Sequence, residues 1–258
     1  MAGVQRNEDE TQAAQTADEA SHTPEQASRR KWMGAGASLA IGGFLPAGFA
    51  GAAAAPGDAP KPNPVAPAEV LKRLQEGNAR YAANKPNERD FSAERAARAT
   101  AQYPVAAILS CADSRVVPDL VFDQEPGDLF VCRVAGNIVT KDLLASIEYG
   151  VEFLGAVLIV VMGHSSCGAV DAAIKVVKKD AKLPGHLPEL MLAIKPAVLA
   201  AEKKSSGTLL DNSIAENVRR QVAALKRATP IIARDYAAKK IDIVGGVYDI
   251  ATGKVTMV

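Results

Sequence analysis

The chain has 258 residues, of which 48% are hydrophobic and 23% charged, a composition typical of a globular protein with a sizeable core. Lys and Arg number 30 against 29 Asp and Glu, so no basic excess favours nucleic acid, and a small-molecule partner is expected. Aromatic residues make up only 5%, which gives little support to a protein-binding surface built on aromatic anchors.

The N-terminal part of the chain differs in composition from the rest. A polar segment at 1–27 is followed by SRRKWM at 28–33 and by the uncharged run GAGASLAIGGFLPAGFAGAAAA at 34–55. A paired arginine before a mildly apolar run that ends in small residues resembles a bacterial twin-arginine export signal. The match is imperfect, because Trp32 and Met33 stand where Phe and Leu are usual. This pattern predicts export to the periplasm.

A membrane anchor that is never cleaved is the alternative for the run at 34–55. The run is nearly long enough to span a bilayer, but its glycines and Pro46 make it a poor membrane helix. We therefore predict a signal peptide over 1–55 and no stable membrane anchor after cleavage. The Pro-rich stretch 56–65 predicts a linker, and the folded domain is expected at 66–258.

Two amphipathic helices are predicted at the start of the folded part. EVLKRLQEGNARYAAN at 69–84 places apolar residues near helical spacing. SAERAARATAQ at 92–102 predicts a second helix, with Ser92 as its N-cap and with Arg95 and Arg98 facing outward.

Short apolar runs and helical stretches then alternate along the chain. The runs are rich in Val, Ile and Leu and do not alternate with polar residues, which indicates strands covered on both faces: VAAILS at 105–110, DLFVCRV at 128–134, AVLIVVMG at 156–163 and IDIVGGVYDI at 241–250. Helical patterns lie at 140–155, 167–180 and 210–228. This order predicts an α/β fold with a mostly parallel sheet flanked by helices. DIATGK at 249–254 predicts a C-terminal β-hairpin in which Gly253 has a positive φ.

Two motifs place reactive side chains at the ends of predicted strands. CADSR puts Cys111, Asp113 and Arg115 after the first strand, and GHSSCG puts His164 and Cys167 after the third. Open α/β sheets bind their ligands at the carboxyl ends of parallel strands. Two thiolates and one imidazole suit Zn²⁺ in a catalytic site with one open position. The sequence therefore predicts one zinc ion held by Cys111, His164 and Cys167.

Each part of this pattern has a simpler interpretation. Cys111 and Cys167 could form a disulfide in an oxidising periplasm, or each could be a small buried hydrophobe. Asp113 and Arg115 could form an ordinary surface ion pair. The occurrence of both motifs after buried strands favours zinc, and the proximity of a metal favours a functional role for the ion pair. Cys132 lies within a predicted strand and is expected in the core.

The paired motifs CADSRV and GHSSCGAV resemble those of the β-class carbonic anhydrases, zinc enzymes that interconvert carbon dioxide and bicarbonate. The similarity extends over about 66–256 and includes LQEGNARY, EPGDLFVCRVAGN, SIEYGVEFLG, NVRRQV and GGVYDIATGKV. It implies a Rossmann-like sheet, an N-terminal helical arm that reaches over a partner, and a homodimer or a dimer of dimers.

The resemblance also implies a role for each residue of the two motifs. Cys111, His164 and Cys167 match the zinc ligands, and Asp113 with Arg115 matches the catalytic dyad. Zinc lowers the pKa of a bound water towards neutrality. Asp113 would orient the resulting nucleophile, while Arg115 would hold the carboxylate by a charge-assisted pair. Released from Arg115, the same carboxylate could take the open position on zinc.

Further positions are implied by the resemblance alone. The implied substrate-pocket residues, partly contributed across a dimer interface, are Gln102, Phe130, Ala135, Tyr149 and Gly168. Ala135 stands where some members have Val, which could enlarge the pocket. Ile108 stands where one subgroup has a Trp for a regulatory bicarbonate site, so this regulation is not expected. His186 in LPGHLPEL is a candidate proton shuttle.

Two other functions fit parts of this pattern. A hydrolase of carbonyl sulfide or carbon disulfide is the nearer alternative, because these substrates resemble carbon dioxide in shape and electrophilicity. A non-catalytic zinc-binding or thiol-redox protein of the cell envelope is the more distant one. That protein would have no use for Asp113 and Arg115.

Overall fold

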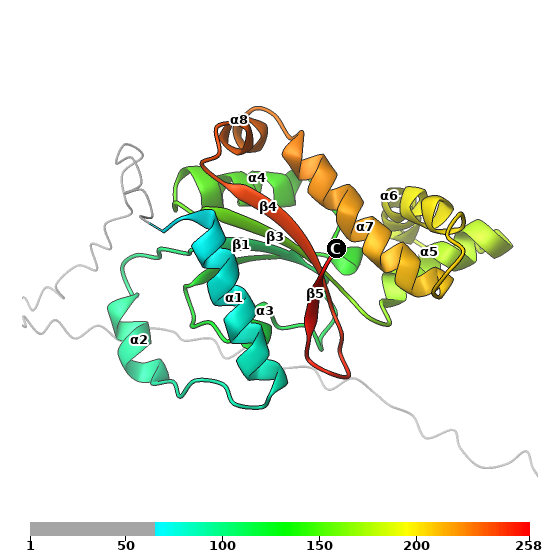
Figure 1. The fold of residues 1–258 in the computed structure, drawn as a ribbon. Helices are drawn as coiled ribbons and strands as arrows, with labels where there is room; N and C mark the ends of the chain where they lie inside the picture. Colours follow the sequence, from blue (N-terminus) through cyan, green and yellow to red (C-terminus); the bar gives the residue numbers. More distant parts are fainter. Residues whose placement is uncertain (1–64) are drawn as a thin grey trace, which may run out of the picture. The chain divides into compact units, whose positions relative to one another are not determined.

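A computed structural model describes residues 65–258, so the predicted signal peptide and all but the last residue of the predicted linker lie outside the described residues. Five strands form one sheet in the order β2-β1-β3-β4-β5, with helices on its faces (Figure 1). The strands are β1 (Ala106–Ser110), β2 (Leu129–Arg133), β3 (Leu158–His164), β4 (Asp242–Tyr248) and β5 (Val255–Met257). β1 to β4 are parallel, which confirms the predicted fold class.

The helices occupy the connections between the strands and the segment before β1. They are α1 (Pro67–Ala82), α2 (Phe91–Ala97), α3 (Pro118–Val121), α4 (Lys141–Glu152), α5 (Gly168–Lys179), α6 (Leu187–Ala201), α7 (Leu209–Lys226) and α8 (Ile231–Ala237). A short 3₁₀ turn, η1 (Ala135–Asn137), follows β2. Within 65–258, none of these helices combines the length and the apolar character needed to cross a bilayer.

The central strands are buried on both faces, as the unbroken apolar runs predict. Every residue of β1 and β3 is buried. Along β3, Val160 packs into the core cluster that includes residues of α1, whereas Val161 packs into the cluster that includes residues of α4 and α7. Successive side chains of a strand point to opposite faces of its sheet, so both faces need an apolar cover. This is why the strands carry no polar alternation.

The predicted C-terminal hairpin is confirmed. β5 pairs antiparallel with β4, and Gly253 has a φ of 75° in the turn between them. The Gly253 N–H donates to the carbonyl of Asp249 at 2.9 Å. The Asp249 carboxylate accepts from the Thr252 N–H at 2.7 Å. The positive φ at residue 253 therefore closes a turn that the Asp249 side chain also supports.

Two predictions about the second helix are wrong. α2 begins at Phe91, so Ser92 lies inside it, and the Asp90 carboxylate accepts from the Ser92 N–H at 3.0 Å. Arg98 does not face solvent freely, because its Nη2 donates to Asp128 Oδ1 at 2.8 Å. Arg95 is exposed, as predicted. Both errors arise from partners that the helical pattern alone does not identify.

Three helices were not predicted from the sequence pattern. α3 and α8 are short, and their few residues show no helical period. α6 contains Pro196 and has apolar residues around much of its circumference, which hides its helical period. Its buried residues, among them Met191, Ile194 and Val198, pack with α5 in a third core cluster next to the strand ends.

Candidate metal centre

The sheet topology brings the two predicted motifs together. Cys111 directly follows β1, and His164 is the last residue of β3. β1 and β3 are paired neighbours, with Ser110 opposite Met162, so both motifs lie at the same edge of the sheet. From β1 the chain continues to β2 on one side, whereas β3 lies on the other. Ligands of open α/β sheets bind at such a change of direction.

Three donor atoms converge at this edge. The ligand atoms of Cys111, His164 and Cys167 all lie within 4.8 Å of one another, and all three residues are buried. Cys111 and Cys167 are free thiols, which argues against the disulfide interpretation. Cys132 packs in the core beside α4 and α7, where burial raises its pKa to about 11. The prediction that Cys132 is a core residue is confirmed.

The hydrogen bonding of His164 leaves one ring nitrogen available. Nδ1 lies 2.9 Å from the carbonyl oxygen of Ser165, which can only accept, so Nδ1 carries the proton. The lone pair is then on Nε2. This atom is buried and has no hydrogen-bond partner among the described residues. A buried acceptor without a partner is costly, and a metal ion would satisfy it.

The pKa values of the two thiols are shifted in opposite directions. The hydrogen bond with Cys167 lowers the pKa of Cys111 to about 4 against the opposing effect of burial, with further contributions from His164 and the backbone of Gly136. The same contact and burial raise the pKa of Cys167. Cys111 is therefore the thiol of the pair that ionises more readily. The S₂N donor set fits Zn²⁺, whose binding would release the proton of Cys167.

Asp113 and Arg115 form a bidentate pair beside the donor atoms. Arg115 Nε donates to Asp113 Oδ1 at 2.9 Å, and Nη2 donates to Oδ2 at 2.7 Å. The backbone N–H of Arg115 adds a third hydrogen bond to Oδ1 at 3.0 Å. These hydrogen bonds from Arg115 hold the pKa of Asp113 well below its usual range despite partial burial. Asp113 Oδ2 lies 3.9 Å from His164 Nε2, so the carboxylate borders the metal site.

Arg133, at the end of β2, is a site residue that sequence reasoning missed. Its Nε donates to the carbonyl of Cys111 at 3.1 Å, and its Nη2 donates to the carbonyl of Asp113 at 2.6 Å. One guanidinium therefore holds the backbone on both sides of Ala112. The position of Arg133 at the end of the strand-like run FVCRV could have indicated a role at the site. That inference requires the knowledge that β2 lies beside β1.

The predicted pocket residues fall into two groups. Ala135 and Gly168 adjoin the metal site, since Ala135 precedes Gly136 and Gly168 follows Cys167. A Cβ added at Gly168 would have no atom within 4 Å, so the space beside it is open. Ile108 is fully buried in β1. The small residues thus lie where a small substrate could approach the donor atoms.

The other group lies away from the donor atoms of the same chain. Phe130 pairs with Ala107 in the first half of β2, far from Cys111 along the strand. Its ring centroid lies 6.2 Å from that of Tyr149, which lies 5.4 Å from that of Phe153. Gln102 is exposed in the segment before β1. Within one chain, over residues 65–258, these side chains are not brought to the metal site.

The candidate proton shuttle, His186, makes its closest described ionic contact away from the metal site. The side chain of His186 is 99% exposed just before α6, where its Nδ1 lies 4.0 Å from Glu189 Oε1. Among the described residues it shows no ion pair with Asp113. Its proposed role therefore stays a prediction.

Comparison with known proteins gives matches over most of the described residues. A protein-family model described as carbonic anhydrase matches residues 106–255. The chain is 38% identical over 199 residues to a carbonic anhydrase of Mycolicibacterium smegmatis, covering 77% of this chain and 95% of that protein. It is 38% identical over 200 residues to carbonic anhydrase 2 of Mycobacterium tuberculosis, covering 77% of this chain and 94% of that protein.

Solved structures show the same similarity. The β-carbonic anhydrase of Coccomyxa, solved in complex with acetazolamide, matches with a TM-score of 0.58 and 28% identity, covering 73% of this chain and 84% of that chain. A tetrameric β-carbonic anhydrase of Sordaria macrospora matches with a TM-score of 0.57 and 25% identity, covering 73% of this chain and 96% of that chain.

Proposed function

This chain belongs to the β-class carbonic anhydrases, which are zinc-dependent carbonate dehydratases, and from this premise we propose that Cys111, His164 and Cys167 hold the zinc ion that hydrates carbon dioxide reversibly. The observation that carries the assignment is the state of His164 Nε2. This buried atom has no hydrogen-bond partner among the described residues, and the ligand atoms of His164 and both cysteines lie within 4.8 Å of one another.

The surrounding side chains are suited to the reaction. Bound zinc would supply a Lewis acid that lowers the pKa of water. Asp113, ionised because of Arg115, offers a carboxylate oxygen that accepts an O–H bond and orients the oxygen for attack on carbon dioxide. Arg133 fixes the backbone carbonyls on either side of Ala112, so the carboxylate keeps its direction. The open space beside Gly168 leaves room for a triatomic substrate.

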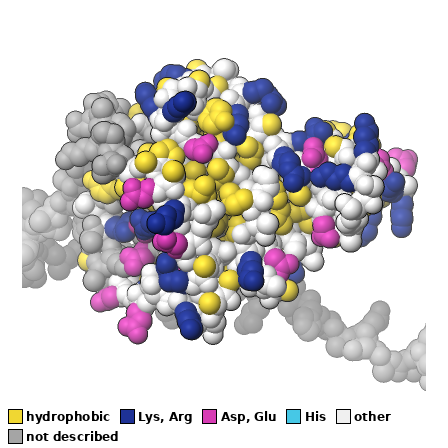
Figure 2. All heavy atoms as spheres, viewed as in Figure 1, with side chains coloured by type: hydrophobic (Ala, Val, Ile, Leu, Met, Phe, Trp, Pro, Cys, Tyr) yellow, Lys and Arg dark blue, Asp and Glu magenta, His cyan; other side chains and the backbone are white. Residues whose placement is uncertain are grey.

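We further propose that the active form is a homo-oligomer, with a homodimer as the minimum unit. The ring of Phe130 lies near that of Tyr149, which stacks on Phe153. Tyr149 and Phe153 are 49% and 57% exposed, and β2, which carries Phe130, lies at an edge of the sheet. A partner chain would cover this aromatic row and bring Gln102, Phe130 and Tyr149 to the pocket. Figure 2 shows a second apolar region, between α1 and α7, that could join two such dimers.

Metal analysis and kinetics on the same preparation test the assignment. We expect one zinc ion per chain and carbon dioxide hydration that disappears on chelation and returns on addition of zinc. A preparation with full zinc that releases sulfide from carbonyl sulfide but does not hydrate carbon dioxide would favour the hydrolase alternative. Zinc without either activity would favour the non-catalytic alternative.

We also propose that residues 1–55 direct export to the periplasm by the twin-arginine route. The support is the sequence SRRKWM before an uncharged run, since this segment lies outside the described residues. This route carries folded proteins, so the thiols could receive zinc in the reducing cytosol. The double substitution Arg29→Lys and Arg30→Lys should leave full-length protein in the cytoplasm, as cell fractionation would show. Unchanged periplasmic accumulation would contradict the proposal.

A further inference from the structure

The loop after β2 supplies a hydrogen-bond donor to Cys111 through an unusual backbone conformation. Gly136 has a φ of 75° and Asn137 a φ of 44°, so two consecutive residues are left-handed. A Cβ at residue 136 would come within 2.6 Å of Ile194 Cδ1. The left-handed conformation therefore favours glycine here, and a larger residue would also have to displace the end of the Ile194 side chain. In this conformation the Gly136 N–H donates to Cys111 Sγ at 3.3 Å.

Two buried amides on α7 bind the same loop. The Val139 N–H donates to Gln221 Oε1 at 2.9 Å. Gln221 Nε2 donates to Asn217 Oδ1 at 3.2 Å, and Asn217 Nδ2 donates to the carbonyl of Gly136 at 2.8 Å. Asn217 is 1% exposed and Gln221 is 8% exposed. We refer to this series from Val139 through Gln221 and Asn217 to Gly136 as the amide relay.

The amide relay has one consistent orientation. The backbone N–H of Val139 can only donate and the Gly136 carbonyl can only accept, so the oxygen and nitrogen of both side chains are fixed. Asn217 and Gln221 are four residues apart and therefore lie on one face of α7. Together they attach two points of the loop, at residues 136 and 139, to a single rigid helix.

This attachment bears on the metal site through one peptide. Rotation of the backbone at Gly136 would move its N–H away from Cys111 Sγ, and glycine opposes such rotation less than any other residue. A hydrogen bond to a metal-bound thiolate orients the sulfur and reduces its electron density. Fixing the Gly136 carbonyl from the other side therefore fixes a donor to the ligand.

We propose that Asn217 and Gln221 are positioning residues of the zinc centre, which act by holding the Gly136 N–H on the sulfur of Cys111. This inference rests on the proposed function, because it takes Cys111 as a zinc ligand. Neither amide contacts Cys111 itself in the hydrogen bonds described. Their influence is expected to travel through the loop alone.

The test measures the metal site directly, by two readouts that do not depend on turnover. One is the zinc dissociation constant, from competition with a chelator, and the other is the thiolate-to-metal absorption band of the Co²⁺-substituted protein. Asn217→Ala should weaken zinc binding by about tenfold and shift the band, because the Gly136 carbonyl loses its anchor. Gln221→Met should change both readouts in the same direction but less, because Asn217 keeps its bond to Gly136.

A control on the same helix separates positioning from general stability. Val222→Ala removes two methyl groups from a side chain that packs against the core but takes no part in the amide relay. It should lower the denaturation midpoint while leaving zinc affinity and the cobalt band as in the wild type. If Asn217→Ala does not fold, Gln221→Met against Val222→Ala decides the matter.

The outcomes distinguish this inference from the proposed function. Wild-type zinc affinity and an unshifted cobalt band in both amide variants would overturn the inference and leave the zinc centre intact. Failure of the wild type itself to bind zinc would instead refute the proposed function.

Discussion

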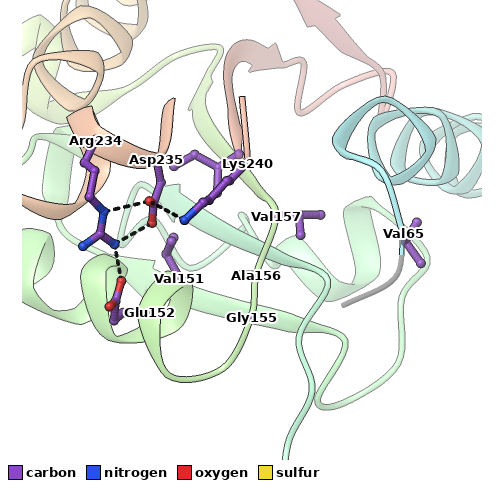
Figure 3. A pocket seen from close by; sticks show the side chains of 10 residues that line it. Val65, Val151, Glu152, Gly155, Ala156, Val157, Arg234, Asp235 and Lys240 are labelled. Atoms are coloured by element: carbon purple, nitrogen blue, oxygen red, sulfur yellow. Dashed lines mark hydrogen bonds and ion pairs between the residues drawn. The ribbon is translucent and has the colours of Figure 1, made fainter. Parts of the chain in front are cut away.

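The two ends of the sheet both gather charged or ionisable side chains, but they differ in whether those groups are satisfied. At the amino ends of β3 and β4, Arg234 binds Glu152 at 2.5 Å and Asp235 at 2.8 Å, and Lys240 lies 3.7 Å from Asp235 (Figure 3). These side chains help to line a pocket of about 460 Å³. At the carboxyl ends, the buried His164 Nε2 has no hydrogen-bond partner within residues 65–258.

The difference shows that neither a pocket nor a charge cluster marks the reactive end of this sheet. Each charged group in the amino-end cluster has an oppositely charged neighbour, so none of these side chains offers an unpaired charge to a ligand. The carboxyl-end cluster has three donor atoms within 4.8 Å of one another, an arrangement that a cation between them would stabilise. The unsatisfied acceptor therefore identifies the site better than the cavity does.

Among the substitutions considered, removal of one thiol at the carboxyl end should have the largest effect on zinc binding and activity. Cys111→Ala or Cys167→Ala should lose zinc and hydration activity together, because two remaining ligands are too few for a firm catalytic site. Metal analysis and stopped-flow hydration assays would measure both effects. Cys132→Ala is the matched control and should keep both. Metal loss in Cys132→Ala with metal retained in Cys111→Ala would show that the ligand assignment is wrong.

Arg115→Ala tests the charged pair that borders the donor atoms. It removes both guanidinium hydrogen bonds to Asp113 and leaves the ligand set intact. Zinc should be retained, while kcat for hydration falls by about 100-fold because the carboxylate no longer has a fixed direction. Arg115→Lys should recover only part of the rate, since an ammonium cannot make the bidentate contact. A crystal structure of active Arg115→Ala with Asp113 unmoved would contradict this account.

Arg133→Met should have a smaller effect at the same end. The variant loses the hydrogen bonds to the carbonyls of Cys111 and Asp113, so the loop that carries both side chains becomes less well ordered. We expect kcat/KM to fall by about tenfold with zinc content unchanged. Arg220→Met, which alters a surface pair with Glu216 on α7, is the control and should leave kcat/KM unchanged. Equal kinetics in both variants would rule out a role for Arg133.

Asp235→Asn tests the amino-end cluster and should have the smallest effect, confined to stability. The free energy of unfolding at neutral pH should fall by about 1 kcal/mol, because the partners of Asp235 are largely exposed. Zinc content and hydration should stay at wild-type values. Chemical denaturation together with metal analysis would measure these quantities.

The pH dependence of that variant sharpens the test. Hydrogen bonds from Arg234 lower the pKa of Asp235 despite its burial. A lowered pKa contributes stability above the unfolded value of about 4, and this contribution is lost as the pH falls further. The unfolding free energies of wild type and Asp235→Asn should therefore converge in acid. A difference that persists well below pH 4 would show that the ion pair is not its cause.

The sequence was sufficient to predict the parts of the fold that depend on local pattern. Buried parallel strands require continuous apolar residues, so the runs that became β1 and β3 were recognisable. The hairpin was predictable because Gly253 marks a turn between two strand-like runs. α6 was missed because Pro196 and its broad apolar surface obscure the helical period. The hydropathy pattern thus identified the elements in which the spacing of buried residues follows a single regular period or an unbroken apolar run.

The site was predictable only where residue chemistry is specific. Cysteine and histidine at strand ends have few roles, so Cys111, His164 and Cys167 could be named without a structure. Arg133 and Asn217 could not, because an arginine or a buried amide serves many purposes. Their contacts join residues 22 and 81 positions apart and depend on the strand order and on the place of α7. The hydropathy pattern of the chain does not determine the strand order or the position of α7, so it does not predict these contacts.

The crossover between the two ligand-bearing strands has a consequence for the folding of the chain. Cys111 and His164 are 53 positions apart, and the intervening segment contains β2 and α4. An ion coordinated by both residues closes this segment into a loop, much as a disulfide would. By the chain-entropy estimate for a cross-link of this span, closure disfavours the unfolded ensemble by roughly 4 kcal/mol. The catalytic ion would thus also act as a cross-link that stabilises the fold. The wild-type chain without its metal should therefore unfold at a lower temperature than the chain with zinc bound.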